Sequence, residues 1–222
     1  MDDMRTILCS PFSEYLTKVY TTLIESFGPQ RWWPGETPFE IMVGAVLTQN
    51  TYWSNASRAI DNIKAAGLLD PKKLLCNQRK VPHLVKPSGF YRLKGKRLLA
   101  LCDYFVAKYQ ANVKKMKKRN LGSLRNELLT IKGIGKETAD SILLYALDRP
   151  VFVVDAYTRR IFSRHGYFTY DAPYDKIRLL FEHNLPRKSK IYNELHALLV
   201  KLGKTRCKKN EPLCSTCLLQ RV

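Results

Sequence analysis

The stretch IKGIGKETAD, residues 131–140, combines a glycine turn with charged side chains that could take part in chemistry. Gly133 and Gly135 allow backbone geometries that a larger side chain would obstruct. A helix that begins after such a turn presents unpaired N–H groups, and its dipole favours a bound anion such as a phosphate. The same pattern also serves as an ordinary connection between two helices, because short glycine motifs are weak signals on their own.

Asp155 follows the apolar run VFVV and precedes a segment that is predicted to be helical. The simplest role for an aspartate at this place is that of an N-cap, which accepts hydrogen bonds from backbone N–H groups. A helix–glycine turn–helix unit followed about twenty residues later by such an aspartate is much more specific than either part alone.

All three tryptophans of the chain occur in two short aromatic segments. Trp32, Trp33 and Pro34 stand together in RWWPG, and Trp53 ends LTQNTYW. Core packing is the commonest use of tryptophan. Adjacent tryptophans in an extended segment cannot both face one core, because their side chains point to opposite sides. Flat aromatic groups would also suit an enzyme that stacks a base taken out of a duplex.

Three of the six cysteines, Cys207, Cys214 and Cys217, form the pattern C-x6-C-x2-C near the end of the sequence. Clustered cysteines generally indicate a zinc site. The remaining cysteines are isolated, and we expect them to be small buried side chains. These are Cys9, Cys76 and Cys102.

The elements that must position these groups are predicted to be helices. Apolar residues recur at i, i+3, i+4 and i+7 in Leu195–Leu202 and in Ala139–Ala146, and Phe39–Leu47 is a further apolar helix candidate. The β-like run at 151–154 is too short and isolated to make a sheet. Several mid-length helices joined by short loops favour an all-α protein.

The charge of the chain favours a polyanionic partner. Its 222 residues contain 38 Lys and Arg against 19 Asp and Glu, which gives a net charge of +19. An excess of this size indicates nucleic acid first. The densest run, Lys114–Arg119, is expected to be a solvated loop near phosphates. We find neither a membrane-spanning apolar run nor a signal peptide, so we expect a cytoplasmic, nucleoid-associated protein without a membrane partner.

Together these motifs resemble the helix-hairpin-helix DNA glycosylase superfamily, of which endonuclease III is the best known type. The resemblance extends from about Arg31 to the C-terminus. It implies that the hairpin grips a DNA phosphate through backbone amides, and that Asp155 is the catalytic residue for cleavage of the N-glycosidic bond. The DNA contacts implied in the hairpin are Gly133, Ile134, Gly135 and Lys136.

Superfamily members that also cut the DNA backbone carry a nucleophilic lysine two residues after the second glycine. This sequence has Glu137 at that position, and Lys136 lies one place earlier. One step along a helix turns a side chain by about 100°, so Lys136 should not substitute. A carboxylate cannot form an imine with the sugar. The resemblance therefore implies a monofunctional enzyme that uses water as its nucleophile.

The segments WWPG, LTQNT, KPSGFYRLKGKRL, KGIGKETAD and VVD look like those of bacterial 3-methyladenine DNA glycosylases of this superfamily. That likeness implies a base pocket in which Trp53 stands where phenylalanine is usual. Gln49 would insert into the duplex and fill the place of the flipped base. The implied pocket residues are Trp32, Trp33, Pro34 and Trp53. Aromatic faces attract cations, and an N3-methylated adenine is cationic while it is attached to the sugar.

In the same superfamily, C-x6-C-x2-C-x5-C binds a [4Fe–4S] cluster. Cys207, Cys214 and Cys217 match that spacing, and the fourth ligand would fall at position 223, one residue after the last one given. We expect that the sequence is clipped there. The alternative is an incomplete or exogenous ligand set, since four thiolates are the usual complement.

The predicted architecture is a two-domain all-α glycosylase with an iron–sulfur loop. Residues 30–148 would carry the pocket and hairpin, and residues 1–29 plus 149–222 would form the second domain, with DNA in the cleft between them. The expected activity is hydrolysis of alkylated purines, chiefly 3-methyladenine, from damaged double-stranded DNA by a monomer. The alternatives are a glycosylase for oxidised pyrimidines or mismatched adenine, and a non-catalytic DNA-binding module.

Overall fold

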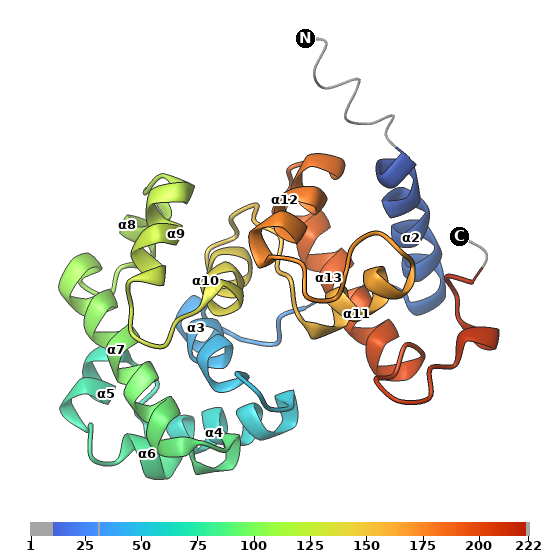
Figure 1. Ribbon diagram of the computed structural model, residues 1–222. Coiled ribbons are helices and arrows are strands. Elements are labelled where there is room, and N and C mark those ends of the chain that lie inside the picture. Colours follow the sequence, from blue (N-terminus) through green and yellow to red (C-terminus); the bar gives the residue numbers. More distant parts are fainter. Residues whose placement is uncertain (1–10, 31, 221–222) are drawn as a thin grey trace. The chain divides into compact units, whose positions relative to one another are not determined.

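All regular structure in the described part of the chain is helical. The computed structural model describes residues 11–30 and 32–220, and within them Figure 1 shows helices and loops without strands. This confirms the all-α class predicted from sequence. The apolar run 151–154 is buried, but it forms no strand. No described helix has both the length and the apolar character needed to cross a membrane.

The chain divides into two compact units. One is Trp33–Leu147, and the other joins the chain up to Trp32 with the chain from Asp148 onward. The helices of the first unit are α3 (Pro38–Leu47), α4 (Trp53–Ala65), α5 (Pro71–Cys76), α6 (Val81–Leu84), the 3₁₀ turn η1 (Lys86–Ser88), α7 (Tyr91–Tyr109), α8 (Val113–Lys117), α9 (Leu121–Leu129), α10 (Lys136–Ser141) and the π-helical turn η2 (Ile142–Ala146).

Helix α3 forms the centre of the unit Trp33–Leu147. Thr37 caps its N-terminus by accepting the N–H of Glu40 at 3.1 Å, and Pro38 occupies the first turn, where no N–H is required. Helices α4 and α7 and the turn η2 all pack against α3, so nearly all of its residues are buried. Helices α5 and α6 pack against the long helix α7.

A buried lysine fixes the C-terminal end of α3. The Lys94 Nζ atom donates to the carbonyl oxygens of Leu47, at 2.8 Å, and Ser88, at 2.5 Å. Burial, and to a lesser extent the charge of Arg97, lowers the pKa of Lys94 to about 8. The ammonium group satisfies a helix-terminal carbonyl that has no intrahelical partner, and it thereby anchors the loop that follows α3.

The second unit is built from α2 (Pro11–Phe27), α11 (Ala156–Arg164), α12 (Tyr174–Asn184), α13 (Ser189–Thr205) and the 3₁₀ turn η3 (Cys214–Thr216). Helix α13 packs on α11 and α2. Its four periodic leucines in Leu195–Leu202 are fully buried, which confirms the helix predicted from their spacing. Phe152 and Phe181 stack in the same core with ring centroids 4.2 Å apart.

Two expectations from sequence are wrong in detail. The basic run is not all loop, because Val113–Lys117 forms helix α8, which Asn112 caps and buried Met116 anchors. Its lysines are exposed, as expected for a solvated run. Cys76 is exposed rather than buried, since it ends the short helix α5, whose buried residues are Pro71 and Leu74. Cys102 is buried as predicted, and Cys9 lies outside the described residues.

Candidate active site

Three aromatic rings meet in the unit Trp33–Leu147, and we call them the aromatic corner: Trp33, Trp53 and Tyr145. The indoles of Trp33 and Trp53 are nearly perpendicular, at 87°, with ring centroids 5.3 Å apart. The ring centroids of Tyr145 and Trp33 lie 5.0 Å apart, so Trp33 contacts both of the other rings. Both tryptophans are half-buried, whereas Tyr145 is buried. The structure thus brings two of the predicted pocket residues together.

The other two predicted pocket residues have different surroundings. Pro34 follows Trp33 and is exposed. Trp32 belongs to the second unit, where the Lys204 Nζ atom lies 5.9 Å from its ring centroid. That distance permits a cation–π contact. Their role in binding a base stays a prediction.

The glycine turn is held by buried side chains on either side of its exposed glycines. Gly133 has φ +88°, in the left-handed region that favours glycine. A Cβ atom there would lie 2.4 Å from Cγ of Arg97, so the arginine stem leaves no room for one. Ile134 is buried and anchors the turn. Gly135 then precedes α10 as its N-cap, without a side-chain cap hydrogen bond.

A buried ion pair joins the two helices of the hairpin. Arg125 on α9 donates from Nε and Nη2 to the two carboxylate oxygens of Asp140 on α10, at 2.6 and 3.0 Å. Asp140 is fully buried, and a bidentate pair of this kind fixes the orientation of both partners. The ion pair therefore fixes α9 and α10 relative to each other, and with them the orientation of the turn that joins the two helices.

Gln49, the predicted duplex-inserting residue, is bonded to the hairpin in this structure. Its Nε2 atom donates to the Gly133 carbonyl at 3.1 Å and to the Thr138 hydroxyl at 2.9 Å. Its Oε1 atom accepts from Arg97 Nη1 at 2.5 Å. Gln49 thus links the loop after α3 to the turn that carries the glycines.

Asp155 is carried by an extended segment that α12 holds in place. The Phe152 N–H donates to Glu182 Oε1 at 2.9 Å, and the Val154 N–H donates to the Tyr174 hydroxyl at 3.3 Å. Side chains thereby replace the ladder bonds that a sheet would provide. Asp155 then begins α11 as its N-cap.

The two carboxylate oxygens of Asp155 have different partners. Oδ1 accepts the N–H of Thr158 at 2.7 Å, and Oδ2 lies 3.5 Å from Nε2 of His196 on α13. Burial opposes ionisation of Asp155, but His196 and Thr158 outweigh it, so the pKa of the carboxyl lies below its ordinary value. The group is therefore a carboxylate at neutral pH, with 13% of its side chain exposed.

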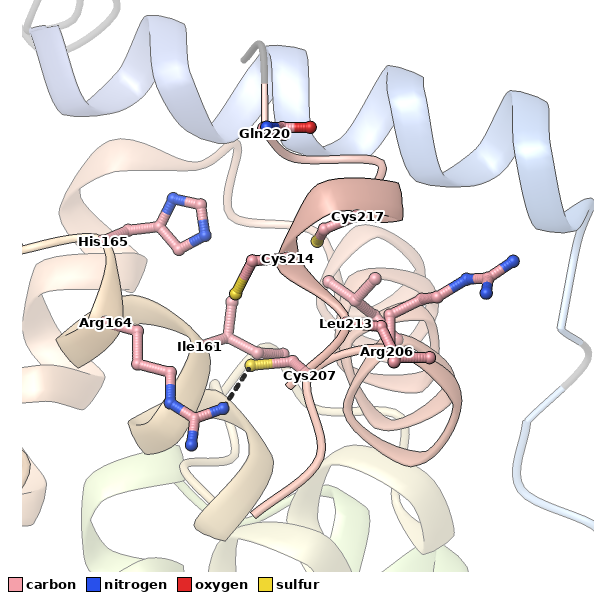
Figure 2. Close-up of a pocket in the computed structure, with 10 residues that line it drawn as sticks. Ile161, Arg164, His165, Arg206, Cys207, Leu213, Cys214, Cys217 and Gln220 are labelled. Carbon is pink, nitrogen blue, oxygen red and sulfur yellow. Dashed lines mark hydrogen bonds between the residues drawn. The ribbon is translucent and has the colours of Figure 1, made fainter. Parts of the chain in front are cut away.

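The three C-terminal cysteines line one cavity of about 170 Å³, which Figure 2 shows. Arg164 Nη1 donates to the Cys207 Sγ atom at 3.3 Å, and Cys214 and Cys217 come from the turn η3 and its end. Three soft sulfur donors around one cavity suit iron–sulfur or zinc chemistry. Within residues 11–30 and 32–220, however, no three His, Cys, Asp or Glu side chains are gathered closely enough to hold a metal ion. The residues present therefore fit a thiolate-bound group in type but leave its ligand set open.

Sequence reasoning did not single out three residues that the structure places at these sites. Tyr145 stands in an aliphatic segment, and only the π-helical turn shows which way it points. His196 occurs at a core-facing position of an amphipathic helix, an unusual place for a histidine that could have been noticed. Arg97 is one of many basic residues, and its contact with the glycine turn has no sequence signal.

Comparison with known proteins identifies the family. The profile described as "HhH-GPD superfamily base excision DNA repair protein" matches residues 43–187. A protein of Methanocaldococcus jannaschii, named provisionally as a DNA repair glycosylase, is 50% identical over 207 residues that cover 92% of this chain and 93% of that protein. The chain therefore belongs to the HhH-GPD superfamily and is a DNA glycosylase of the endonuclease III superfamily.

Solved structures agree with this assignment. The H. pylori 3-methyladenine DNA glycosylase bound to 1,N6-ethenoadenine superposes with a TM-score of 0.76 at 29% identity, covering 86% of this chain and 96% of that one. A non-covalent endonuclease III–DNA complex has a TM-score of 0.79 at 20% identity and covers 94% and 93% of the two chains, which shows the shared fold. Membership of a base excision DNA repair superfamily supports DNA as the macromolecular partner of this protein.

Proposed function

We propose that the protein is a monofunctional DNA glycosylase that removes alkylated purines, chiefly 3-methyladenine, from double-stranded DNA as a monomer. The observation that carries this proposal is the corner formed by the perpendicular indoles of Trp33 and Trp53. An electron-rich aromatic face favours a flat cationic base by about 0.5–2 kcal/mol for each good stack. The similarity to the H. pylori enzyme, whose name gives the same substrate, supports this proposal.

The proposed reaction needs little help with the leaving group. The bond between C1′ of the sugar and the purine nitrogen breaks, and its electron pair leaves with the base. Because the alkylated base is cationic, it departs as a neutral molecule without prior protonation. The sugar becomes an oxocarbenium-like cation, as in glycoside hydrolysis. Water adds to C1′ and loses a proton to solvent or to Asp155.

Asp155 would stabilise that cationic sugar. Its carboxylate is ionised at neutral pH, because His196 and the Thr158 N–H offset the effect of its burial. The N-cap bond through Oδ1 fixes the group, and Oδ2 is the oxygen directed to His196. A preorganised anion gains catalytic effect from needing no rearrangement during the reaction.

The absence of lyase chemistry follows from Glu137. Lys136 and Glu137 are the first two residues of α10 and both are exposed. By the family resemblance, Glu137 stands where a Schiff-base lysine is found in lyases, and a carboxylate cannot form the imine. Borohydride should therefore trap no covalent enzyme–DNA adduct. Efficient trapping would mean that another amine acts as the nucleophile.

Cys207, Cys214 and Cys217 would hold an iron–sulfur cluster, with a fourth ligand from outside the described residues. Bound there, the cluster would crosslink Cys207 to the turn η3 within the C-terminal segment and take no part in base hydrolysis. Purified protein should then contain iron and acid-labile sulfide and absorb near ~400 nm. Stoichiometric zinc in a colourless protein would contradict this assignment.

A panel of lesion duplexes tests the substrate. Oligonucleotides that carry 3-methyladenine, 7-methylguanine, an oxidised pyrimidine or a mismatched adenine are compared under single-turnover conditions. The proposal predicts the fastest release for 3-methyladenine. Fastest release of an oxidised pyrimidine or mismatched adenine would assign the protein to those lesions, and release of no base would leave only a DNA-binding role.

A further inference from the structure

Gly44 lies inside helix α3, where glycine is less favourable than alanine because it loses more conformational freedom on folding. Packing explains its presence. A Cβ atom on Gly44 would stand 3.1 Å from Trp33 Nε1, 3.3 Å from Trp33 Cζ2 and 3.3 Å from Trp53 Cζ3. Both indoles of the aromatic corner therefore rest on the same bare backbone. Even a methyl group there would push at least one of them outward by a few tenths of an ångström.

Tyr145, the third ring of the aromatic corner, supports Trp33. It lies in the π-helical turn η2, in which the Leu147 N–H donates to the Ile142 carbonyl at 3.1 Å, five residues back. This wider turn changes the direction in which its side chains point, compared with an α-helix, and such turns are frequent at functional sites. The buried Tyr145 ring contacts Trp33 at an interplanar angle of 42°.

We propose that Gly44 and Tyr145 are positioning residues that set the size of base accepted by the aromatic corner. Gly44 sets how deeply both indoles sit on α3, and Tyr145 sets the tilt of Trp33. A base stacked on one indole meets the other nearly at a right angle, so small shifts of either ring change which bases fit. The inference rests on the proposed function, since it assumes that Trp33 and Trp53 receive the base.

The test replaces Gly44 by alanine. Gly44→Ala should slow single-turnover release of 3-methyladenine from methylated duplex at least tenfold, which corresponds to about 1.4 kcal/mol and lies within the range for one base–aromatic stack. Its affinity for duplex containing an abasic site should stay within about twofold of wild type, because that site has no base to stack. Free 1,N6-ethenoadenine, which is larger than 3-methyladenine, should lose more inhibitory strength than free 3-methyladenine.

Gly95→Ala is the matched control. Gly95 also lies inside a helix of the same unit, α7, and a Cβ atom there would crowd Pro82 at 3.2 Å without touching a tryptophan. The rate at which Gly95→Ala releases 3-methyladenine should remain close to that of wild type. Intrinsic fluorescence provides a second readout, because all three tryptophans of the chain lie in the two aromatic segments. Gly44→Ala should change the emission, and Gly95→Ala should not.

Variants of Tyr145 keep the proposal testable if Gly44→Ala does not fold. Tyr145→Leu should slow release of 3-methyladenine and shift the tryptophan emission, whereas Tyr145→Phe should recover most of the rate because it keeps the ring. Equal losses of base release and of abasic-site affinity would mean that these residues only support the fold. Wild-type rates in Gly44→Ala would also overturn the inference while leaving the proposed function intact. Failure of the wild-type protein to release 3-methyladenine would overturn both.

Discussion

Asp155→Asn separates the catalytic role of this residue from its structural one. The carboxylate caps α11 through the 2.7 Å bond from the Thr158 N–H to Oδ1. Asparagine keeps an oxygen in the same position, and it is about as good an N-cap as aspartate. The variant should therefore fold with nearly the stability of the wild-type protein. What it loses is the negative charge.

The expected loss of rate follows from that charge. A carboxylate about 4 Å from the sugar cation, with an effective dielectric constant of about 20, interacts with it by about 4 kcal/mol. Each 1.36 kcal/mol is a factor of ten in rate, so Asp155→Asn should reduce single-turnover excision by about 10³. Binding to a duplex that contains an abasic site should change by less than about threefold, because backbone contacts dominate affinity for DNA.

The assay measures base release with enzyme in excess and, separately, the unfolding midpoint and the affinity for abasic-site DNA. The pH dependence adds a further check. Because the pKa of Asp155 lies below its ordinary value of 3.8, its ionisation should produce no fall in rate between about pH 5 and 8. A near-normal rate in Asp155→Asn would show that the residue is a helix cap and nothing more. A large loss of stability would show that capping had been underestimated.

Three further outcomes are expected. His196→Asn removes the imidazole that helps to lower the pKa of Asp155, so the acid limb of the pH–rate profile should move to higher pH; an unmoved limb would contradict the coupling. Burial opposes ionisation of Glu127, but two tyrosine hydroxyls and two cations lower its pKa from 4.5 to about 2. Its stabilisation is thus present above pH 4.5 and lost as pH falls toward 2, and Glu127→Gln should lower the unfolding free energy by about 1–2 kcal/mol at pH 7 but hardly at pH 2. Replacing Lys114 and Lys115 of α8 by glutamine should reduce the slope of log K against log salt for duplex DNA by up to about 1.8, at about 0.9 for each lost phosphate contact. The same change in the two exposed lysines of α5 serves as the comparison and should leave the slope at its wild-type value. A wild-type slope in the α8 variant would remove α8 from the DNA-binding surface.

Helices with a clear apolar period could be read from the sequence. Leu195–Leu202 lies in α13, which buries its periodic leucines, and the apolar segment Phe39–Leu47 lies in α3, which is buried on nearly all sides. Asp155 could also be read as an N-cap, since an apolar run ends just before it and a helical segment begins just after it. Local patterns of this kind depend on the nearest few residues, and tertiary contacts here reinforce them.

Features that depend on distant parts of the chain could not be read in this way. The aromatic corner needs the π-helical turn that directs Tyr145 toward Trp33, although these residues are far apart in the sequence. The bonds of Gln49 to Arg97 and to the glycine turn join three separate segments. Helix α8 was missed because burial of Met116 gives it an anchor that its lysine-rich composition hides.

The most direct test of the proposed function is the identity of the base released from methylated double-stranded DNA. Wild-type protein is incubated with the DNA, and the free bases are separated by chromatography while abasic sites and strand breaks are counted in parallel. The proposal predicts free 3-methyladenine, one abasic site for each base released, and no enzyme-dependent strand breaks. Absence of released 3-methyladenine, or strand breaks that match the abasic sites in number, would contradict it.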